Sequence, residues 1–361
     1  MHEQQFLQGY RVLDLSQYIP GPYATRQLAD LGADIIKIEP PGGDPMRHFM
    51  YSDSGAVSPF YRHLNRGKRV LRLDLKSDTG ASVFRSLLEG ADVLLESFRP
   101  GVLERLGFGR EQLVQINERL VHCTLSGFGQ TGPYRLRAGH DLTYCAVSGS
   151  LTPSHGSDKP AITFPPLADH AGAMQAVNAI LAALLGRERT SKGAFLDISL
   201  CESALSWQYL GLQDGPSGQA RLILTGGAAY YNIYQTADRR FVSLAPLEPK
   251  FWHAFCGAVE HPDWVARQSE PLPQEALTGQ LQEMFASRPL EYWQDKLKDV
   301  DCCFEPIPPM EGVEQHPQIQ SRRTLHGDEP SYPAWIDGSP VPFGSEMEEV
   351  TDDGQVNWRK R

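Results

Sequence analysis

Hydrophobic and polar positions along the first two hundred residues alternate between short apolar runs and amphipathic segments. Short apolar runs predict strands, and the longer segments between them, which begin after proline or end at glycine, predict helices. The predicted strands cover 11–15, 33–39, 70–75, 92–96, 120–126 and 195–200. The predicted helices cover 23–31, 79–88 and 168–185, with shorter ones near Val102, Glu111 and Glu202. Such alternation indicates an α/β domain with a doubly wound parallel sheet, in which ligands lie at the carboxyl ends of the strands.

The pattern changes after residue 212, where a glycine-rich stretch over 213–228 predicts a linker. Residues 230–235 and 240–244 then predict a β-hairpin, followed by helices near Phe251, Leu277 and Tyr292. We therefore expect a large domain over 1–212 and a smaller α+β domain over 229–315. The tail over 316–361, rich in proline, glycine and acidic residues, is expected to be mostly irregular and to wrap over another part of the chain.

Composition narrows the function classes. The 361 residues carry a formal net charge of −10, which disfavours a nucleic-acid or anionic-membrane partner because such surfaces need an excess of Lys and Arg. The longest apolar stretch, 176–186, is far shorter than the roughly 20 residues of a membrane span, so we expect a cytoplasmic protein. The six cysteines show no zinc-ligand spacing and no disulfide framework, and no metal is expected.

A glycine-rich motif, Gly127-Phe-Gly-Gln-Thr-Gly132, follows a predicted strand and matches the GxGxxG pattern of dinucleotide-binding sites. Pro133 follows the third glycine, where the pyrophosphate-binding helix should begin, and no acidic residue ends a strand about 20 residues later. The motif therefore favours a tight glycine loop over some other ligand. The chain contains no GxxxxGK[ST] motif, which excludes a P-loop.

Two basic clusters stand out on this acidic chain. One comprises Arg66, Lys68 and Arg69, with Lys76 nearby, and the other comprises Arg99 and Arg105. Charge alone favours a solvated surface. Arg99 lies at the predicted carboxyl end of a strand, however, just before a helix N-terminus suited to anions. Together the clusters, including Arg66 and Lys68, are candidates to hold the phosphates of a nucleotide-like cofactor.

Three further residues are candidates for chemistry. His140 lies in a Gly-His-Asp context, Asp169 lies in the first turn of a predicted helix, and Glu248 lies between a hairpin and a helix. Taken singly, they are typical of a loop histidine, a helix N-cap and an exposed carboxylate. The positive end of the helix dipole is also expected to keep Asp169 ionised, and its free N–H groups are candidate donors to a developing oxyanion.

Taken together, these stretches resemble the class III coenzyme A transferase superfamily (CaiB/BaiF type), and most closely its α-methylacyl-CoA racemase branch. The likeness extends from about Arg11 to Pro317 and is most specific over Leu13–Pro22, Leu31–Pro40, Asn65–Arg69, Asp92–Gly101 and Leu125–Tyr134. It implies a large domain that receives the tail again, a homodimer of interlocked chains, and coenzyme A as part of the substrate with no permanently bound cofactor. The positions where the family binds coenzyme A correspond to Lys76, Ser97, Phe98, Arg99 and Arg105.

The superfamily divides by chemistry. In its transferases an aspartate matching Asp169 attacks the acyl-CoA thioester, whereas in its racemases that aspartate works with a histidine and a glutamate. This chain is similar to the racemases at all three positions, with Gly139-His140-Asp141, Asp169 and Glu248-Pro249. Inverting the carbon next to a thioester carbonyl requires two bases, one on each face, and His140 and Asp169 are the candidates. Glu248 would orient His140.

The resemblance leaves three functions open. The first is a racemase of 2-methylacyl-CoA thioesters, the second a coenzyme A transferase with Asp169 as nucleophile, and the third an inactive paralogue that only binds coenzyme A. The chain departs from the racemases at His170, where they usually carry an aromatic or small residue, and after Pro342, where the usual helical ending is missing.

Overall fold

The structure is a computed structural model that describes residues 5–50, 57–215, 218–350 and 357–359. It divides the chain into two compact units. The first unit comprises Met1–Ser150, Thr163–Ser206 and Gln318–Arg361, and the second comprises Leu151–Ile162 and Trp207–Pro317. The sequence placed the first boundary at 212 and contained no signal for the short excursion at 151–162.

The first unit contains a seven-stranded parallel sheet in the order β14-β3-β2-β1-β4-β5-β6. Its strands are β1 Arg11–Leu15, β2 Asp34–Glu39, β3 Arg69–Arg72, β4 Val93–Glu96, β5 Val121–Ser126, β6 Ala194–Ser199 and β14 Glu348–Val350. The predicted α/β class is confirmed, and all six predicted strands are present. Because the strand order reverses between β1 and β4, the loops that follow these two strands meet at the topological switch point of the sheet.

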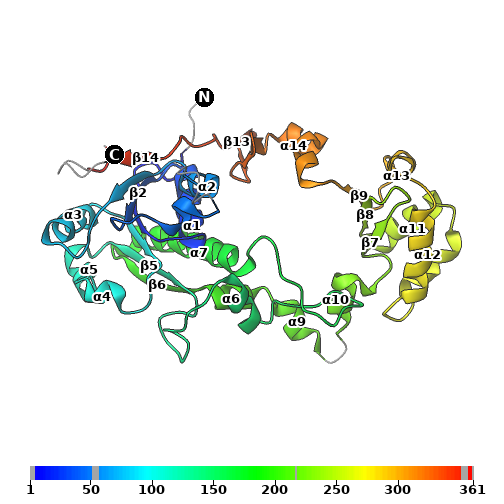
Figure 1. The fold of residues 1–361 in the computed structure, drawn as a ribbon, viewed down its shortest axis with the longest axis horizontal. Helices are drawn as coiled ribbons and strands as arrows, with labels where there is room; N and C mark the ends of the chain where they lie inside the picture. The colour runs from blue at the N-terminus through cyan, green and yellow to red at the C-terminus, as the bar shows by residue number, and fades with distance from the viewer. Residues whose placement is uncertain (1–4, 51–56, 216–217, 351–356, 360–361) are drawn as a thin grey trace. The chain divides into compact units, whose positions relative to one another are not determined.

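Helices cover both faces of this sheet (Figure 1). Their bounds are α1 Pro20–Asp30, α2 Pro59–Asn65, α3 Asp78–Glu89, α4 Val102–Arg105, α5 Arg110–Ile116, α6 Asp141–Val147, α7 Leu167–Thr190 and α8 Leu200–Ser206, with the 3₁₀ helix η1 at Pro45–His48. Because side chains alternate along a strand, Leu13 and Leu15 of β1 pack with Phe84 of α3 on one face. The intervening Asp14 faces α1, where Thr25 donates to it over 2.5 Å.

The observed helices differ from the predicted ones mainly at their ends. Helix α1 begins at Pro20 rather than at Tyr23, because a proline in the first turn lacks only an N–H that would have no helical partner there. Helix α7 continues past Leu185 to Thr190, where Arg187 and Arg189 lie in the last turn and complement the helix dipole.

The tail is more regular than the sequence predicted. It contains α14 Pro317–Arg322 and two short antiparallel ladders, β10 Leu325–His326 with β11 Glu329–Pro330 and β12 Trp335–Ile336 with β13 Ser339–Pro340. Its strand β14 then pairs in parallel with β3, with Glu349 opposite Val70. Figure 1 shows this red C-terminal strand at the edge of the blue part of the sheet. Such pairing joins residues far apart in the sequence, so a local pattern does not reveal it.

The second unit is built around a three-stranded antiparallel sheet of β7 Asn232–Gln235, β8 Phe241–Leu244 and β9 Phe304–Ile307. The predicted hairpin and three helices are present, as α11 Pro249–Ala258, α12 Glu275–Ala286 and α13 Leu290–Leu297. The 3₁₀ helices η5 Pro262–Ser269 and η6 Met310–Gln315 complete it. The core is aromatic, with Trp252, Phe255 and Phe285 fully buried.

The predicted linker is largely helical in its described part. Helix α9 Tyr209–Gln213 leads into it, followed by α10 Gln219–Leu222 and the π-helical segment η4 Ile223–Gly227.

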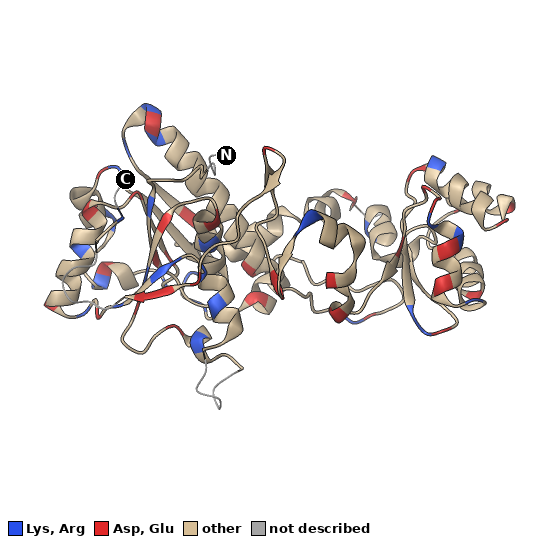
Figure 2. Ribbon diagram, turned by 90° about the horizontal axis from the view of Figure 1, so that it is seen from above, with Lys and Arg blue, Asp and Glu red and all other residues tan. Residues whose placement is uncertain are grey.

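Basic and acidic residues are interspersed within each unit (Figure 2). Over the described ranges, no helix is both long and apolar enough to cross a membrane.

Candidate active site

The loop after β1 and the loop after β4 are joined at the switch point. The backbone N–H of Gln17, in the first loop, donates to Oγ of Ser97, in the second, over 3.1 Å. Ser97, a predicted coenzyme A contact, therefore lies at the position where doubly wound sheets bind ligands.

His140 and Asp169 lie at the N-terminal ends of two neighbouring helices. His140 is the N-cap of α6, where its backbone N–H donates to the hydroxyl oxygen of Thr143 over 3.0 Å. Asp169 lies in the first turn of α7, whose N-cap is Pro166, so the interpretation of Asp169 as an N-cap is wrong. Oδ1 of Asp141, the residue after His140, accepts from the backbone N–H of Asp169 over 3.0 Å. Asp141 thus joins the helix ends that carry the two candidate bases.

The loop that carries His140 is held by a close approach of Tyr144. The hydroxyl of Tyr144 donates to the carbonyl oxygen of Gly139 over 2.6 Å. A Cβ atom on Gly127 would lie 2.4 Å from the Tyr144 ring, and one on Gly139 would lie 2.6 Å from it. Both positions therefore require glycine, which explains why the glycine loop after β5 and the Gly-His-Asp segment occur together.

Ring contacts place the β1–α1 loop and the first turn of α1 beside these helix ends. The rings of Tyr18 and His140 meet edge-to-face with centroids 5.9 Å apart, and those of Tyr23 and His170 meet with centroids 5.0 Å apart. The candidate bases therefore lie next to the switch point. Tyr18 and Asp141 had no predicted role, although they lie within Leu13–Pro22 and the Gly-His-Asp segment.

The carboxyl group of Asp169 is not held ionised as the sequence suggested. Burial, together with the nearby carboxylate of Asp141, raises its pKa to about 7. Loss of hydration and a like charge thus outweigh the helix dipole. Near neutral pH the group is present in both protonation states, which suits a residue that must accept and return a proton.

The helix end also offers fewer free donors than expected. The N–H of Asp169 donates to Asp141, and the N–H of His170 donates to the carbonyl oxygen of Pro166 over 3.4 Å. The His170 ring nitrogen Nδ1 lies 2.6 Å from the same carbonyl oxygen. His170 is thereby tied to the start of its own helix, a local role that the sequence left unassigned.

The loop after β4 is shaped by a residue that the sequence analysis missed. Glu96, the last residue of β4, is buried and its Oε2 accepts from the N–H of Phe98 over 2.6 Å. Burial raises the pKa of Glu96 to about 8, despite this hydrogen bond. The Phe98 ring packs against the core of the sheet, so the loop is anchored at its base while its polar tip remains accessible.

The predicted cationic contacts differ in accessibility. Arg99 and Arg105 are exposed, and the Arg105 guanidinium lies 3.2 Å from the place of a Cβ on Gly101, the N-cap of α4. Lys76 is exposed in the loop after β3. Since β3 and β4 are three strand spacings apart, about 15 Å, Lys76 and Arg99 lie on one edge at a separation suited to an extended ligand.

Arg66 and Lys68, also predicted to bind phosphate, are used inside the protein. Lys68 is fully buried and its Nζ donates to Oδ2 of Asp14 over 3.0 Å. Arg66 is buried against the tail, where it pairs with Glu329 at 2.5 Å and Glu346 at 2.9 Å. Their side chains are committed to these partners, so the prediction for both residues is not retained.

Glu248 belongs to the second unit, where it is exposed and is the N-cap of α11. Its partnership with His140 stays a prediction.

The glycine loop over 127–140 contains no helix, and α6 begins only at Asp141. A pyrophosphate-binding helix does not follow the GxGxxG match, in agreement with the reasoning from Pro133. Within the described residues, no group of three His, Cys, Asp or Glu side chains is arranged to hold a metal ion.

Comparison with known proteins identifies the family of this chain. A model of CoA-transferase family III matches residues 7–350. The chain is 36% identical over 332 residues to the α-methylacyl-CoA racemase of Homo sapiens, covering 88% of this chain and 81% of that protein. It is 32% identical over 330 residues to the acetyl-CoA:oxalate CoA-transferase of Acetobacter aceti, covering 88% and 84%. The crystal structure of Rv3272 from Mycobacterium tuberculosis superposes with a TM-score of 0.80 at 28% identity, covering 95% and 96% of the two chains.

Proposed function

Because this chain belongs to CoA-transferase family III (CaiB/BaiF), we propose that it is a racemase of 2-methylacyl-CoA thioesters. The observation that carries this proposal is the meeting of two helix ends, one bearing His140 and the other Asp169, joined by Asp141. A reaction at the carbon next to a thioester carbonyl needs one group to remove a proton and another to deliver one.

The proposed mechanism is a direct transfer of protons at that carbon. One of the two residues, in its deprotonated form, removes the α-proton and leaves an enolate. The other, in its protonated form, returns a proton to the opposite face and restores the thioester. After one turnover, each residue holds the protonation state that the opposite epimer requires. The same two residues therefore also catalyse the reverse reaction. The pKa of about 7 for Asp169 supports such a role. Glu248 completes the proposal as the carboxylate that orients His140, on the strength of its Glu-Pro context.

Coenzyme A is proposed to lie along the carboxyl edge of the sheet. The residues proposed to contact it are Lys76, Ser97, Phe98, Arg99 and Arg105. The exposed guanidinium groups of Arg99 and Arg105 are suited to phosphate oxygens, and the anchored ring of Phe98 is suited to an apolar or stacking contact.

A coenzyme A transferase is the second candidate, and the similarity to the Acetobacter aceti transferase favours it. In this mechanism the Asp169 carboxylate attacks the thioester carbonyl and expels the coenzyme A thiolate, giving a mixed anhydride. The thiolate then attacks the aspartyl carbonyl and releases the first carboxylic acid. A second, free carboxylate takes the coenzyme A by the same two steps in reverse order. His140 would have no chemical role.

Proton NMR with 2-methylacyl-CoA in deuterated water, without an added carboxylic acid, separates the candidates. Under the racemase proposal, loss of the α-proton signal is fast for both epimers with the wild type, and it falls by a factor of about 10²–10⁴ for one epimer in Asp169→Asn and for the other in His140→Gln. His155→Gln and Asp158→Asn, which change the same residue types in the second unit, should leave it unchanged. No exchange, with acid-dependent transfer lost only in Asp169→Asn, would establish the transferase. Binding of coenzyme A with neither activity would mean an inactive paralogue.

We also propose that two chains form a homodimer. Large apolar side chains on α9 and the residues before it are exposed in the single chain, with Trp207 at 50%, Tyr209 at 56% and Leu212 at 70%. Such side chains are typically covered by a partner. Sedimentation equilibrium should give twice the mass of one chain, and a mass near that of a single chain would refute the dimer.

A further inference from the structure

We propose that Tyr18 is a positioning residue that holds the imidazole of His140, an inference that rests on the proposed function of His140 as a base. Tyr18 lies in the β1–α1 loop, on an element different from that of His140. Their edge-to-face contact, with an interplanar angle of 80°, joins the switch point of the sheet to the helix end that carries the base.

The backbone of Tyr18 has an unusual conformation. Its φ is +63°, in the left-handed region that residues other than glycine seldom adopt. A non-glycine residue keeps this conformation only where its surroundings impose it, and such strain is concentrated at functional sites.

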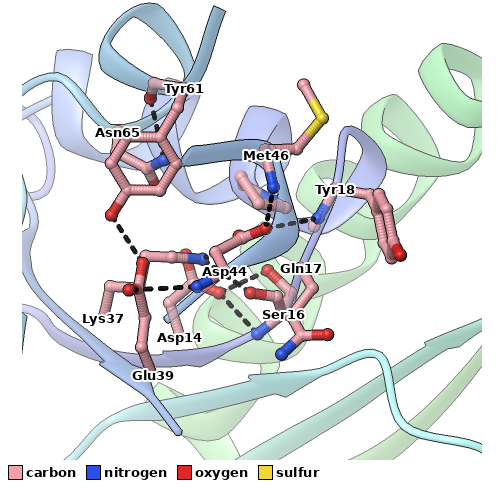
Figure 3. Close-up of polar contacts among 12 residues, drawn as sticks. Asp14, Ser16, Gln17, Tyr18, Lys37, Glu39, Asp44, Met46, Tyr61 and Asn65 are labelled. Carbon is pink, nitrogen blue, oxygen red and sulfur yellow. Dashed lines mark hydrogen bonds and ion pairs between the residues drawn. The ribbon is translucent and has the colours of Figure 1, made fainter. Parts of the chain in front are cut away.

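A buried ion pair holds Tyr18 from one side (Figure 3). Asp44, which is 2% exposed, accepts from the N–H of Tyr18 over 3.4 Å and from the N–H of Met46 over 2.9 Å, both on Oδ1. Its Oδ2 lies 3.0 Å from Nζ of the fully buried Lys37. The same Nζ donates to the carbonyl oxygen of Ser16 over 2.6 Å. One cation thus ties together Asp44 and the loop that carries Tyr18.

The residues just before Tyr18 are fixed as well. The N–H of Ser16 donates to Oδ1 of Asp14 over 2.9 Å, and the N–H of Gln17 donates to Ser97 over 3.1 Å. The backbone groups of three consecutive residues are therefore bound by side chains from other segments: Ser16 by Lys37, Gln17 by Ser97 and Tyr18 by Asp44. Because the loop has so little freedom, the fold sets the position of the Tyr18 backbone and the direction in which its side chain leaves it.

This rigidity has a consequence for His140. The imidazole is exposed, and the hydrogen bonds that hold His140 to Thr143 involve its backbone N–H and carbonyl groups. A fixed aromatic edge restricts the orientation of the ring. Proton abstraction depends on such orientation, because the nitrogen must point at the α-carbon within hydrogen-bond reach. The Tyr18 ring is 44% exposed, and its hydroxyl is not needed for this contact. Phenylalanine at this position should therefore preserve the contact with His140.

The first test compares the two epimers of 2-methylacyl-CoA by α-proton loss in deuterated water. His140→Gln and Asp169→Asn identify which epimer depends on which base. Tyr18→Ala should lower kcat for the His140-dependent epimer at least about tenfold while KM changes less than about threefold, and Tyr18→Phe should restore it. The Asp169-dependent epimer should be little affected. Equal losses for both epimers, a change confined to KM, or failure of phenylalanine to restore the rate would overturn the inference.

The second test does not depend on activity. In protein labelled with ¹³C-histidine, the His140 ring signal is identified by its absence in His140→Gln. It should shift and broaden in Tyr18→Ala and remain near its wild-type position in Tyr18→Phe. An unchanged signal in Tyr18→Ala would refute the contact. If the wild type exchanges neither epimer, the proposed function fails and the positioning role fails with it, whereas wild-type exchange without the Tyr18 effects refutes the positioning role alone.

Discussion

Two basic clusters that look alike in the sequence have opposite environments in the structure. The β3 cluster, Arg66 and Lys68, precedes a strand and is buried in ion pairs. The β4 cluster, Arg99 and Arg105, follows a strand and is exposed at the switch point. In a parallel sheet the carboxyl ends of strands face the ligand, and charge alone does not distinguish the two positions. The comparison shows that the position of a cation relative to its strand predicts its use better than the local charge density.

The same contrast applies to two acidic residues. Asp14 lies beside Lys68 and Lys37, whose charges, with hydrogen bonds from Ser16 and Thr25, hold its pKa well below the usual range although burial alone would raise it. Asp169 lies beside another carboxylate, and its pKa is raised to about 7 by burial and by Asp141. Burial therefore stabilises an ionised carboxylate only where cations are buried with it.

The largest effect is expected for Lys68→Met. It should lower the free energy of unfolding by about 3–5 kcal/mol, because it leaves the Asp14 carboxylate buried without its nearest cation. Urea unfolding at pH 7 measures this loss. The exposed Lys76→Met, as a matched control, should change stability by less than about 0.5 kcal/mol. A loss for Lys68→Met as small as that of the control would show that Lys68 is free, like the β4 cluster.

Asp169→Asn should be more stable than the wild type at high pH. Since the pKa of Asp169 is raised on folding, the wild type loses stability as the pH rises from 4 to 7, and asparagine does not ionise. Three pKa units correspond to about 4 kcal/mol, and partial exposure reduces the expected gain to about 2 kcal/mol at pH 8. Thermal unfolding from pH 4 to 8 measures it, with Asp158→Asn as the control. A difference that does not grow with pH would contradict the raised pKa.

Arg99→Ala and Arg105→Ala should weaken coenzyme A binding without affecting stability. Each removes a proposed charge-assisted phosphate contact, so the Kd for coenzyme A should rise about tenfold, or about 1.4 kcal/mol. Isothermal titration calorimetry measures the Kd, and the melting temperature should remain that of the wild type. Arg189→Ala, which removes an exposed charge at the end of α7, should bind normally. An equal loss in Arg189→Ala would mean that the effect is one of net charge.

Arg66→Gln should have the smallest effect. Unlike Arg99→Ala and Arg105→Ala, it should lower stability and leave coenzyme A binding unchanged. Its partners Glu329 and Glu346 are partly exposed, so the loss of stability should be only about 1 kcal/mol, accompanied by faster proteolysis of the tail. The Kd for coenzyme A should not change. A rise in that Kd without loss of stability would show that Arg66 binds coenzyme A. The β3 and β4 clusters would then not differ in their use.

Much of the large unit was predictable because its elements are marked locally. Each of the strands β1 to β6 is a short apolar run, and proline or glycine marks the turns between them. The positions of His140 and Asp169 were likewise identified from motifs. Tyr18 lies within the same motifs, but its contact with His140 depends on how distant loops are brought together. No periodicity encodes such contacts.

The sequence by itself determined the α/β class, the family and the residue types available for acid–base chemistry, because these follow from local patterns and motifs. Only the tertiary structure decided that Lys68 is buried while Arg99 is exposed, that β14 completes the sheet beside β3, and that Asp169 titrates near neutral pH. The physical reason is common to all three. Burial, ion pairing and strand pairing depend on neighbours that are distant in the chain, and folding alone brings those neighbours into contact.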